Sequence, residues 1–391
     1  MIRVAILSGA AEPGGAERSL LTFLKASQGH TIEALVLLPR LGSLGTLLTA
    51  MNVSWQVIPM PAALLRQSRQ NRGALLWPTI QLIVQAPAYL YHLALAIRKL
   101  NPDVLYTNGI KPHIIGALLR PLLRVPTIWH LRDNWGGALV GRLADLGPHR
   151  IIANSRATAA FLQKDMKHPH KVVVVHNAVD VAEFSPEGDT VPLETAGPKI
   201  GLVAALARLK GHALLLQAAE RILSEFPSAT FYFIGGSIYD TMAEVGYEDE
   251  LRQMIAAKSL AEQVVLTGFQ PQMAPWYRAM DVVVNASIRP ESFGRTLLEA
   301  MACGKAVVGP KAGGIPEFVQ PGKTGLLYEM GNAGALAEAV LSLLREPGWR
   351  QNLGAAGREA AVRRFAPEPH AQAISHILLE GSLGVLTRGI F

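Results

Sequence analysis

The sequence is organised around residues 285–314, which read NASIRPESFGRTLLEAMACGKAVVGPKAGG. The preceding residues 280–286 form a largely apolar, β-branched run that is typical of a strand buried on both faces. After a break at Arg289-Pro290, residues 295–303 are mostly good helix formers, and residues 306–309 predict the next strand. The stretch therefore predicts a strand, loop, helix and strand of an α/β sheet.

Two glutamates flank the start of the predicted helix. Glu291 lies in the loop before it, and Glu299 lies two turns further on. A helix N-terminus suits a phosphate because its N–H groups are unpaired and its dipole is positive, so residues 294–296 predict a diphosphate cradle. A carboxylate accepts hydrogen bonds from vicinal hydroxyls of a sugar or ribose. The alternative is that both glutamates only complement the helix dipole or face solvent. The donor-binding candidates here are Ser292, Phe293, Gly294, Arg295, Thr296 and Glu299.

The spacing of Glu291 and Glu299, followed by GGIPEFVQPGKTGLL at 313–327, resembles the donor-site signature of retaining glycosyltransferases of family four. The resemblance implies the GT-B fold, an α/β architecture of two Rossmann-like doubly wound parallel-sheet domains that face each other across a cleft. It also implies transfer of a hexosyl group from a nucleotide-diphosphate sugar to an acceptor hydroxyl, with retained anomeric configuration. Glu291 would then contact the donor sugar and Glu299 the ribose.

Length and composition set the domain organisation. A chain of 391 residues exceeds what one core usually fills, so two domains are expected. We expect an N-terminal acceptor-side domain over 1–185, a linker over 185–198, and a donor-binding domain over 198–369. The resemblance implies that a last helix, about 370–391, crosses back onto the first domain. The single cysteine, Cys303, excludes an internal disulfide and fits a reducing compartment.

The charge distribution points to the partners. The chain carries a net charge of +7, and the excess of positive charge lies within residues 1–185. This half predicts an anionic partner, either a phosphorylated acceptor or an anionic membrane, unless the charge only aids solubility. Nucleic acid is not expected because the cations are dispersed without interleaved aromatic residues. Residues 1–7 read as a strand rather than a signal peptide, so we expect a cytoplasmic protein, with possible peripheral contact with the inner face of the membrane.

Residues 74–97 are the most apolar stretch of the chain. Their length would span a bilayer, but internal glutamines and prolines argue against a transmembrane helix. The stretch predicts either a buried helix on the sheet or a segment at a membrane interface, near a lipid-linked acceptor. The residues behind this choice are Pro78, Gln81, Gln85, Pro87 and His92 inside the stretch, and Arg66, Arg69, Arg72, Arg98 and Lys99 around it.

The N-terminal half offers further site candidates. Gly14 and Gly15 form a turn before a helix that matches neither a dinucleotide fingerprint nor a P-loop. The resemblance places this turn near the donor phosphates, and a plain tight turn is the alternative. Ligands of open α/β sheets bind beyond the carboxyl ends of strands, where four polar residues follow two predicted strands. By resemblance, His130 lies near the transferred sugar, and the acceptor-side candidates are Asn108, Arg132 and Asp133.

One position departs from the family pattern. Lys210 matches the family lysine that neutralises the diphosphate, but Ala205 occupies the place of the family arginine. Losing a cation weakens binding of a diphosphate or stabilisation of the leaving group, unless Arg208 or Arg295 replaces it. Gly235 ends a strand and is implied to approach the nucleotide. The catalytic candidates are His130, Lys210 and Glu291.

No Asp-x-Asp sequence occurs, so neither a metal nor another cofactor is expected and the transfer is predicted to be metal-independent. The expected partners are a nucleotide sugar and a glycan or lipid-linked acceptor, as in synthesis of cell-surface glycan, polysaccharide or glycolipid. Two alternatives stay open. A catalytically degenerate GT-B module would bind nucleotide without turnover, as Ala205 suggests. A nucleotide-sugar epimerase would need acid/base carboxylates in the first domain, where the loops offer Asp103 and Asp133.

Overall fold

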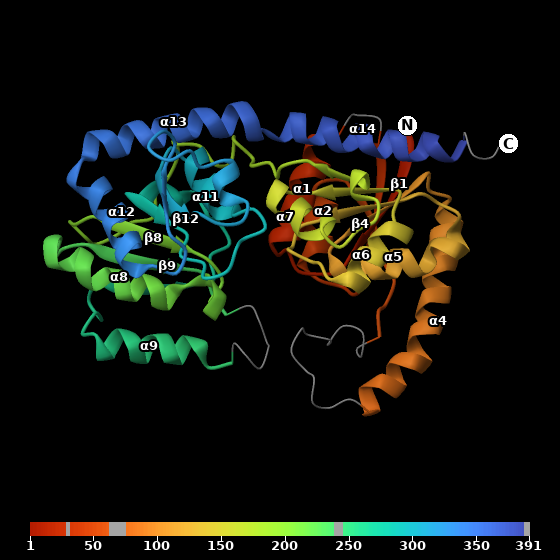
Figure 1. The fold of residues 1–391 in the computed structure, drawn as a ribbon, viewed down its shortest axis with the longest axis horizontal. Coiled ribbons are helices and arrows are strands. Elements are labelled where there is room, and N and C mark those ends of the chain that lie inside the picture. Colours follow the sequence, from red (N-terminus) through yellow and green to blue (C-terminus); the bar gives the residue numbers. More distant parts are fainter. Residues whose placement is uncertain (29–31, 62–75, 238–244, 387–391) are drawn as a thin grey trace. The chain divides into compact units, whose positions relative to one another are not determined.

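The computed structural model describes residues 1–28, 32–61, 76–237 and 245–386, with the side chains of 76–85 and 384–386 left aside. The chain forms two compact units (Figure 1). The first comprises Met1–Ala178 and Pro367–Phe391, and the second comprises Val179–Ala366.

The described part of the first unit contains a parallel sheet with strand order β3-β2-β1-β4-β5-β6-β7. Ser8 pairs with Asn108 and Asn108 pairs with His130, so the carboxyl ends of β1, β4 and β5 lie side by side. The order reverses at β1, as in a doubly wound sheet. The strands are β1 (Ile2–Ser8), β2 (Ile32–Leu38), β3 (Ser54–Val57), β4 (Val104–Asn108), β5 (Thr127–Leu131), β6 (Arg150–Ala153) and β7 (Val172–Val174).

Helices cover both faces of this sheet. Figure 1 shows α14 along one face and α4, α5 and α6 on the other. The first face is covered by α1 (Gly15–Ala26), α2 (Ser43–Ala50) and α14 (Pro367–Leu386), and the second by α4 (Leu76–Leu100), α5 (Ile110–Leu123), α6 (Ala138–Leu146) and α7 (Arg156–Gln163).

The apolar stretch 74–97 falls largely in α4, which continues through Pro87. In its described part, Tyr89, Leu93 and Ile97 are buried in the core against the sheet. This agrees with the prediction of a helix packed on the sheet. No helix in the described ranges is long and apolar enough to cross a membrane. Some of these predictions lie outside what the structure describes. They concern residues 74 and 75, the cations at 66, 69 and 72, and the side chains of residues 78, 81 and 85.

The second unit repeats the architecture. Its described strands form a parallel sheet in the order β10-β9-β8-β11-β12-β13, again reversing beside the first strand. The predicted organising stretch is confirmed, because α11 (Arg295–Ala302) connects β11 and β12, and Val284 pairs with Val308. The strands are β8 (Lys199–Val203), β9 (Thr230–Ile234), β10 (Val264–Gly268), β11 (Val282–Val284), β12 (Ala306–Pro310) and β13 (Leu326–Tyr328).

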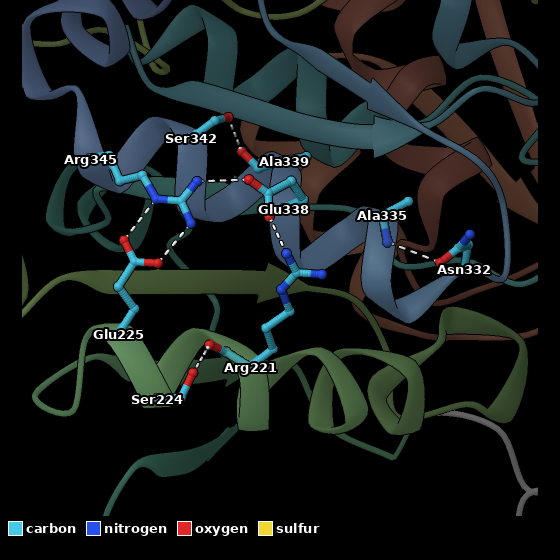
Figure 2. A network of polar contacts seen from close by, with 9 residues as sticks. All are labelled: Arg221, Ser224, Glu225, Asn332, Ala335, Glu338, Ala339, Ser342 and Arg345. Atoms are coloured by element: carbon cyan, nitrogen blue, oxygen red, sulfur yellow. Dashed lines mark hydrogen bonds and ion pairs between the residues drawn. The ribbon is translucent and has the colours of Figure 1, made fainter.

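One helical layer of the second unit carries an ion-pair network (Figure 2). Arg345 donates two hydrogen bonds to Glu225, both at 2.7 Å, and a third to Glu338 at 2.7 Å, while Arg221 also donates to Glu338. These pairs join α8 to α12. This layer contains α8 (His212–Glu225), α9 (Tyr247–Ala257) and α12 (Ala333–Arg345), and the opposite face carries α10 (Ala274–Ala279), α11 and α13 (Pro347–Phe365).

The units divide after Ala178, earlier than the predicted linker at 185–198. The Val179 N–H donates to the Phe365 carbonyl at 2.9 Å, and Val179 and Phe184 pack in the core of the second unit. Segment 179–185 thus lies on the second unit because its apolar side chains are buried there. At the other end, α14 packs on α1 of the first unit.

Candidate active site

An ion pair lies where β8 and β11 end in the second unit. The Lys210 ammonium donates to Glu291 Oε1 at 2.7 Å, and the Ser287 hydroxyl donates to the same oxygen at 2.6 Å. The Lys210 and Glu291 side chains are only 22% and 17% exposed. Burial raises the pKa of Glu291, but the Lys210 charge and the hydrogen bonds from Lys210, Ser287 and Asn285 outweigh it and leave the pKa below its ordinary value. Glu291 is therefore ionised at neutral pH and acts as a hydrogen-bond acceptor.

Two glycines allow the backbone to close around this pair. A Cβ on Gly211 (φ +74°) would lie 1.8 Å from the Ala286 carbonyl oxygen, and one on Gly313 (φ +63°) would lie 2.1 Å from the Glu291 carbonyl oxygen. The Gly314 N–H donates to the same Glu291 carbonyl at 3.0 Å. Only glycine fits these left-handed, crowded positions. The loop carrying Glu291 is thus fixed from the loops after β8 and β12.

Glu299 is held by two side chains. The Tyr277 hydroxyl donates to Glu299 Oε2 at 2.8 Å, and Arg295 donates to Oε1 at 2.9 Å. Burial, and then the nearby Glu299 charge, hold the pKa of Tyr277 well above its ordinary value. Tyr277 is therefore a neutral donor that orients the carboxylate. Tyr277 and Ser287 were not predicted from the sequence, because neither belongs to a recognisable spacing.

The start of α11 presents backbone rather than side chains. Gly294 caps the helix in the left-handed region, at φ +95°, without a side-chain hydrogen bond. Phe293, a donor-binding candidate, is 1% exposed and packs on Phe318 with ring centroids 5.1 Å apart. Its side chain belongs to the core, so a ligand at this helix start would meet main-chain atoms of Phe293. Ser292 and Thr296 are half-buried beside it.

Arg208, the possible replacement for the missing family arginine, is engaged elsewhere. Its guanidinium makes a two-pronged ion pair with Glu250 and stacks over the Tyr247 ring, with 4.8 Å to the centroid. Both partners belong to α9. Gly235 also has a local explanation, because a Cβ there would lie 2.0 Å from the Ala204 carbonyl oxygen. Close packing of two strand ends thus requires this glycine whether or not a nucleotide is bound.

The first unit has its own buried polar cluster, at the carboxyl ends of β1, β4 and β5. Arg132 is 6% exposed and donates to Asn108 Oδ1 at 2.7 Å, to Asn177 Oδ1 at 2.8 Å, and to the Ser19 hydroxyl. Arg132 and Asn108 were predicted from the sequence as site residues, whereas Ser19 and Asn177 were not. Asp133 is exposed on the loop that follows.

His130 lies beneath this cluster. Its Nδ1 shares a hydrogen bond with the Tyr106 hydroxyl, and the ring is fully buried. Burial, followed by the charges of Arg132, His370 and His113, holds the pKa of His130 well below its ordinary value. The imidazole is therefore neutral. His113 is also buried and stacks on Trp129 with ring centroids 5.0 Å apart.

The glycine turn before α1 is a helix cap. The Gly14 N–H donates to Glu17 Oε2 at 3.2 Å, which closes the first turn. Burial raises the pKa of Glu17. A Cβ on Gly15 would meet nothing within 4 Å. In the residues covered by the structure, no group of three or more His, Cys, Asp or Glu side chains could hold a metal ion.

Two doubly wound parallel-sheet units, one of which carries a glutamate before α11 and another within it, are typical of the GT-B architecture. Residues 13–183 match the family described as Glycosyltransferase Family 4, and residues 190–360 match that described as Glycosyl transferases group 1. The chain belongs to glycosyltransferase family 4, as its sequence motif indicated.

Two named relatives agree with this assignment. The chain is 34% identical over 245 residues to a D-inositol 3-phosphate glycosyltransferase of Frankia alni, covering 56% of this chain and 58% of that protein. It is 31% identical over 279 residues to the lipopolysaccharide core biosynthesis mannosyltransferase LpcC of Rhizobium leguminosarum bv. viciae, covering 67% and 74%. The match thus spans little more than half the length of the Frankia relative.

The fold is that of Anabaena Alr3699/HepE, whose crystal structure in complex with UDP-glucose superposes with a TM-score of 0.82 at 24% identity, covering 97% of this chain and 100% of that one. The predicted GT-B fold class is therefore confirmed.

Proposed function

We propose that this glycosyltransferase uses a nucleotide-diphosphate sugar as its donor and transfers a hexosyl group to an acceptor hydroxyl with retained anomeric configuration. The observation that carries the proposal is the pair of carboxylates around the start of α11, each held ionised or oriented by its own partners. A diol is bound by such acceptors and a diphosphate by the helix N-terminus between them. The Anabaena structure with UDP-glucose supports this choice of donor.

In this proposal Glu291 accepts hydrogen bonds from the donor sugar, and Glu299 accepts them from the ribose. Because Glu291 is ionised and paired with Lys210, it is better suited to accept hydrogen bonds from sugar hydroxyls than to donate a proton as a general acid. Lys210 and the α11 N-terminus stabilise the charge of the leaving diphosphate, which removes the need for a metal ion. No side chain is assigned as a nucleophile, and the leaving phosphate helps to take the acceptor proton.

The first unit supplies the acceptor side in this proposal. Arg132 holds Asn108, Ser19 and Asn177 in place, so it acts as a positioning residue. His130 is neutral and buried, and its proposed role is therefore to orient its neighbours on the acceptor side rather than to carry a charge. The acceptor is a glycan or a lipid-linked molecule, as in the lipopolysaccharide core reaction named for the Rhizobium relative. The reaction would take place on the cytoplasmic side.

One observation favours a second candidate, a nucleotide-binding module without turnover. Ala205 lacks the family's cation, and Arg208 is engaged by Glu250. An epimerase has less support. Asp103 accepts a hydrogen bond from the Arg3 backbone N–H at 2.7 Å, near the amino end of β4, away from the carboxyl ends where a donor would lie.

The test is a thermal-shift and calorimetric titration of the full chain with UDP, GDP, ADP and dTDP and their sugars, with and without EDTA. The proposal expects stabilisation by one nucleotide diphosphate family that EDTA does not reduce, and slow donor hydrolysis or transfer whose product keeps the anomeric configuration in proton NMR. Binding without any turnover would favour the module, and loss of binding in EDTA would contradict metal independence.

Tyr277→Phe and Glu299→Gln test whether Glu299 binds the ribose, as distinct from a general loss of folding. The tyrosine variant removes only the hydroxyl that orients Glu299, so donor affinity should fall about three- to tenfold, and Glu299→Gln should lower it more. Tyr328→Phe is a matched control, because its hydroxyl donates to the Asn285 carbonyl rather than to a proposed ligand residue. Equal affinity in all three variants would refute the ribose assignment.

A further inference from the structure

The outer sides of α4 and α5 expose a cluster of large apolar side chains. Tyr91 and Leu95 on α4, and Leu118 and Leu122 on α5, are between 43% and 60% exposed. Within each helix the two residues are four apart, which places them on one side of that helix. Single exposed apolar side chains are ordinary, but four large ones on two packed helices are typical of an interaction site.

The two helices bring these side chains together. The inner sides of α4 and α5 share one core, in which Leu93 and Ile97 pack with Leu119. At their ends the Arg98 guanidinium donates to the Leu122 carbonyl. The apolar residues of α5 therefore adjoin those of α4 rather than lying at separate places on the unit.

Four cations lie at the C-terminal ends of the two helices. Arg98 and Lys99 end α4, and Arg120 and Arg124 end α5. Neither helix contains an aspartate or glutamate. Asp103, in the connection between α4 and β4, is engaged by the Arg3 backbone N–H. Within the described ranges no ion pair neutralises these four cations, so the surface combines uncompensated positive charge with exposed apolar side chains.

We propose that the outer face of α4 and α5 binds the surface of an anionic lipid bilayer. Lysine and arginine are attracted to anionic headgroups, while leucine and tyrosine side chains enter the boundary between headgroups and acyl chains. A partner protein with an acidic surface would need a shaped apolar counterpart, and the absence of any acidic side chain on either helix favours the simpler charged surface of a bilayer. The inference concerns a face of the first unit and does not depend on the identity of the donor.

The proposal predicts selective binding to anionic vesicles. In flotation of the full chain with phosphatidylcholine vesicles, or with vesicles of equal parts phosphatidylcholine and phosphatidylglycerol, the partition coefficient should be at least about tenfold higher for the anionic vesicles. It should fall steeply as salt is raised, because the Debye length shortens. Equal binding to both kinds of vesicle, or no binding, would overturn the proposal.

Matched variants localise the contact. Leu118→Ser with Leu122→Ser should lower vesicle binding about tenfold or more. The control, Leu47→Ser with Leu383→Ser, changes two leucines of similar exposure on α2 and α14, which cover the opposite face of the sheet, and should bind like the parent. Circular dichroism melting checks that both pairs fold.

Charge reversal tests the electrostatic part. Lys99→Glu with Arg124→Glu should abolish the preference for anionic vesicles, whereas Lys323→Glu with Arg363→Glu makes the same change of net charge on the second unit and should retain it. If both charge reversals act alike, net charge rather than this face drives binding, and the proposal fails. It also fails if size-exclusion chromatography shows that the Leu118 and Leu122 substitutions disrupt a dimer, because the face would then bind a second copy.

The single cysteine permits a direct readout. Cys303 is buried, and burial raises the pKa of its thiol to about 12, so it resists labelling. A nitroxide on Leu118→Cys should become protected from an aqueous relaxation agent when anionic vesicles are added, and one on Leu47→Cys should not. Equal protection at both positions would contradict docking through α4 and α5.

Discussion

Replacing Lys210 by methionine tests the ion pair at the centre of the proposed donor site. The 2.7 Å separation from Glu291 corresponds to a gross attraction of about 6 kcal/mol at an effective dielectric constant of about 20. Desolvation of both groups offsets part of this attraction, and both side chains keep some contact with water. Removing the cation leaves an ionised, largely buried carboxylate, which costs about 3 kcal/mol, at the lower end of the range for broken buried pairs. A unit of this size should then melt about 6–12 °C lower.

The measurement is a double-mutant cycle in thermal or urea unfolding, with Lys210→Met, Glu291→Gln and the double variant. Glutamine keeps the shape of the side chain and can still accept the Ser287 hydroxyl. We expect a coupling free energy of about 1.5–3 kcal/mol, so the double variant should be more stable than the sum of the two single losses predicts.

The pH dependence supplies an independent check. The folded pKa of Glu291 lies below its ordinary value of 4.5, so its stabilisation is complete above pH 4.5 and is lost as pH falls through the folded pKa. Without Lys210 the burial of the carboxylate is less compensated and its pKa should rise. The stability difference between parent and Lys210→Met should therefore narrow as pH falls from 7 towards 4. The ion pair would be refuted if the stability losses of the two single variants add up to that of the double variant within about 0.5 kcal/mol and the difference between parent and Lys210→Met does not change with pH.

Three further perturbations follow from the geometry. Gly313→Ala should displace the Glu291 loop, weaken donor binding and lower the free energy of unfolding in urea by about 3 kcal/mol. The control is Gly322→Ala, at φ +71° with nothing within 4 Å of its Cβ, which should lower it by only about 1 kcal/mol. Burial lowers the pKa of His113 to about 3, so below pH 6.5 the unfolded state binds the proton first and the free energy of unfolding falls by up to about 1.4 kcal/mol per pH unit. His113→Phe should remove this contribution. An unchanged slope of the free energy of unfolding between pH 6 and 5 would contradict the assignment. Arg132→Met should cost about 2–4 kcal/mol in urea unfolding, because the buried Asn108 Oδ1 loses its charged donor and Asn177 Oδ1 keeps only the Ser19 hydroxyl. A loss below about 0.5 kcal/mol would count against the buried network.

The elements of the fold follow from the sequence because buried parallel strands leave a strong local signal. The run at Val282–Val284, the helix formers after Gly294 and the short strand at 306–310 appear in the structure nearly as predicted. The proximity of Lys210 to Glu291 has no local signal, since the two residues are 81 positions apart. It follows from the strand order, because β8 and β11 are neighbours at the point where a doubly wound sheet reverses.

The missed partners share a physical reason. Ser19, Asn177 and Tyr277 each contribute one hydroxyl or amide to a cluster assembled from distant segments. Such a contribution depends on side-chain direction and not on residue spacing, so a single sequence gives no indication of it. The ion pair between Arg208 and Glu250 could not be predicted from the sequence either, because α9 and the loop after β8 are distant in sequence and meet only in the folded chain.

Two of the cations proposed near the diphosphate, Arg208 and Lys210, pair with carboxylates in different ways, and this difference decides which of the two a phosphate can recruit. Glu250 takes both terminal nitrogens of Arg208, so a phosphate would have to displace a two-pronged ion pair. Lys210 meets Glu291 through a single oxygen, and an ammonium carries three donors. In our proposal the ammonium keeps its contact with Glu291 when a phosphate oxygen binds beside it. We therefore propose that Lys210, rather than Arg208, is the side chain of the second unit that stabilises the charge of the diphosphate.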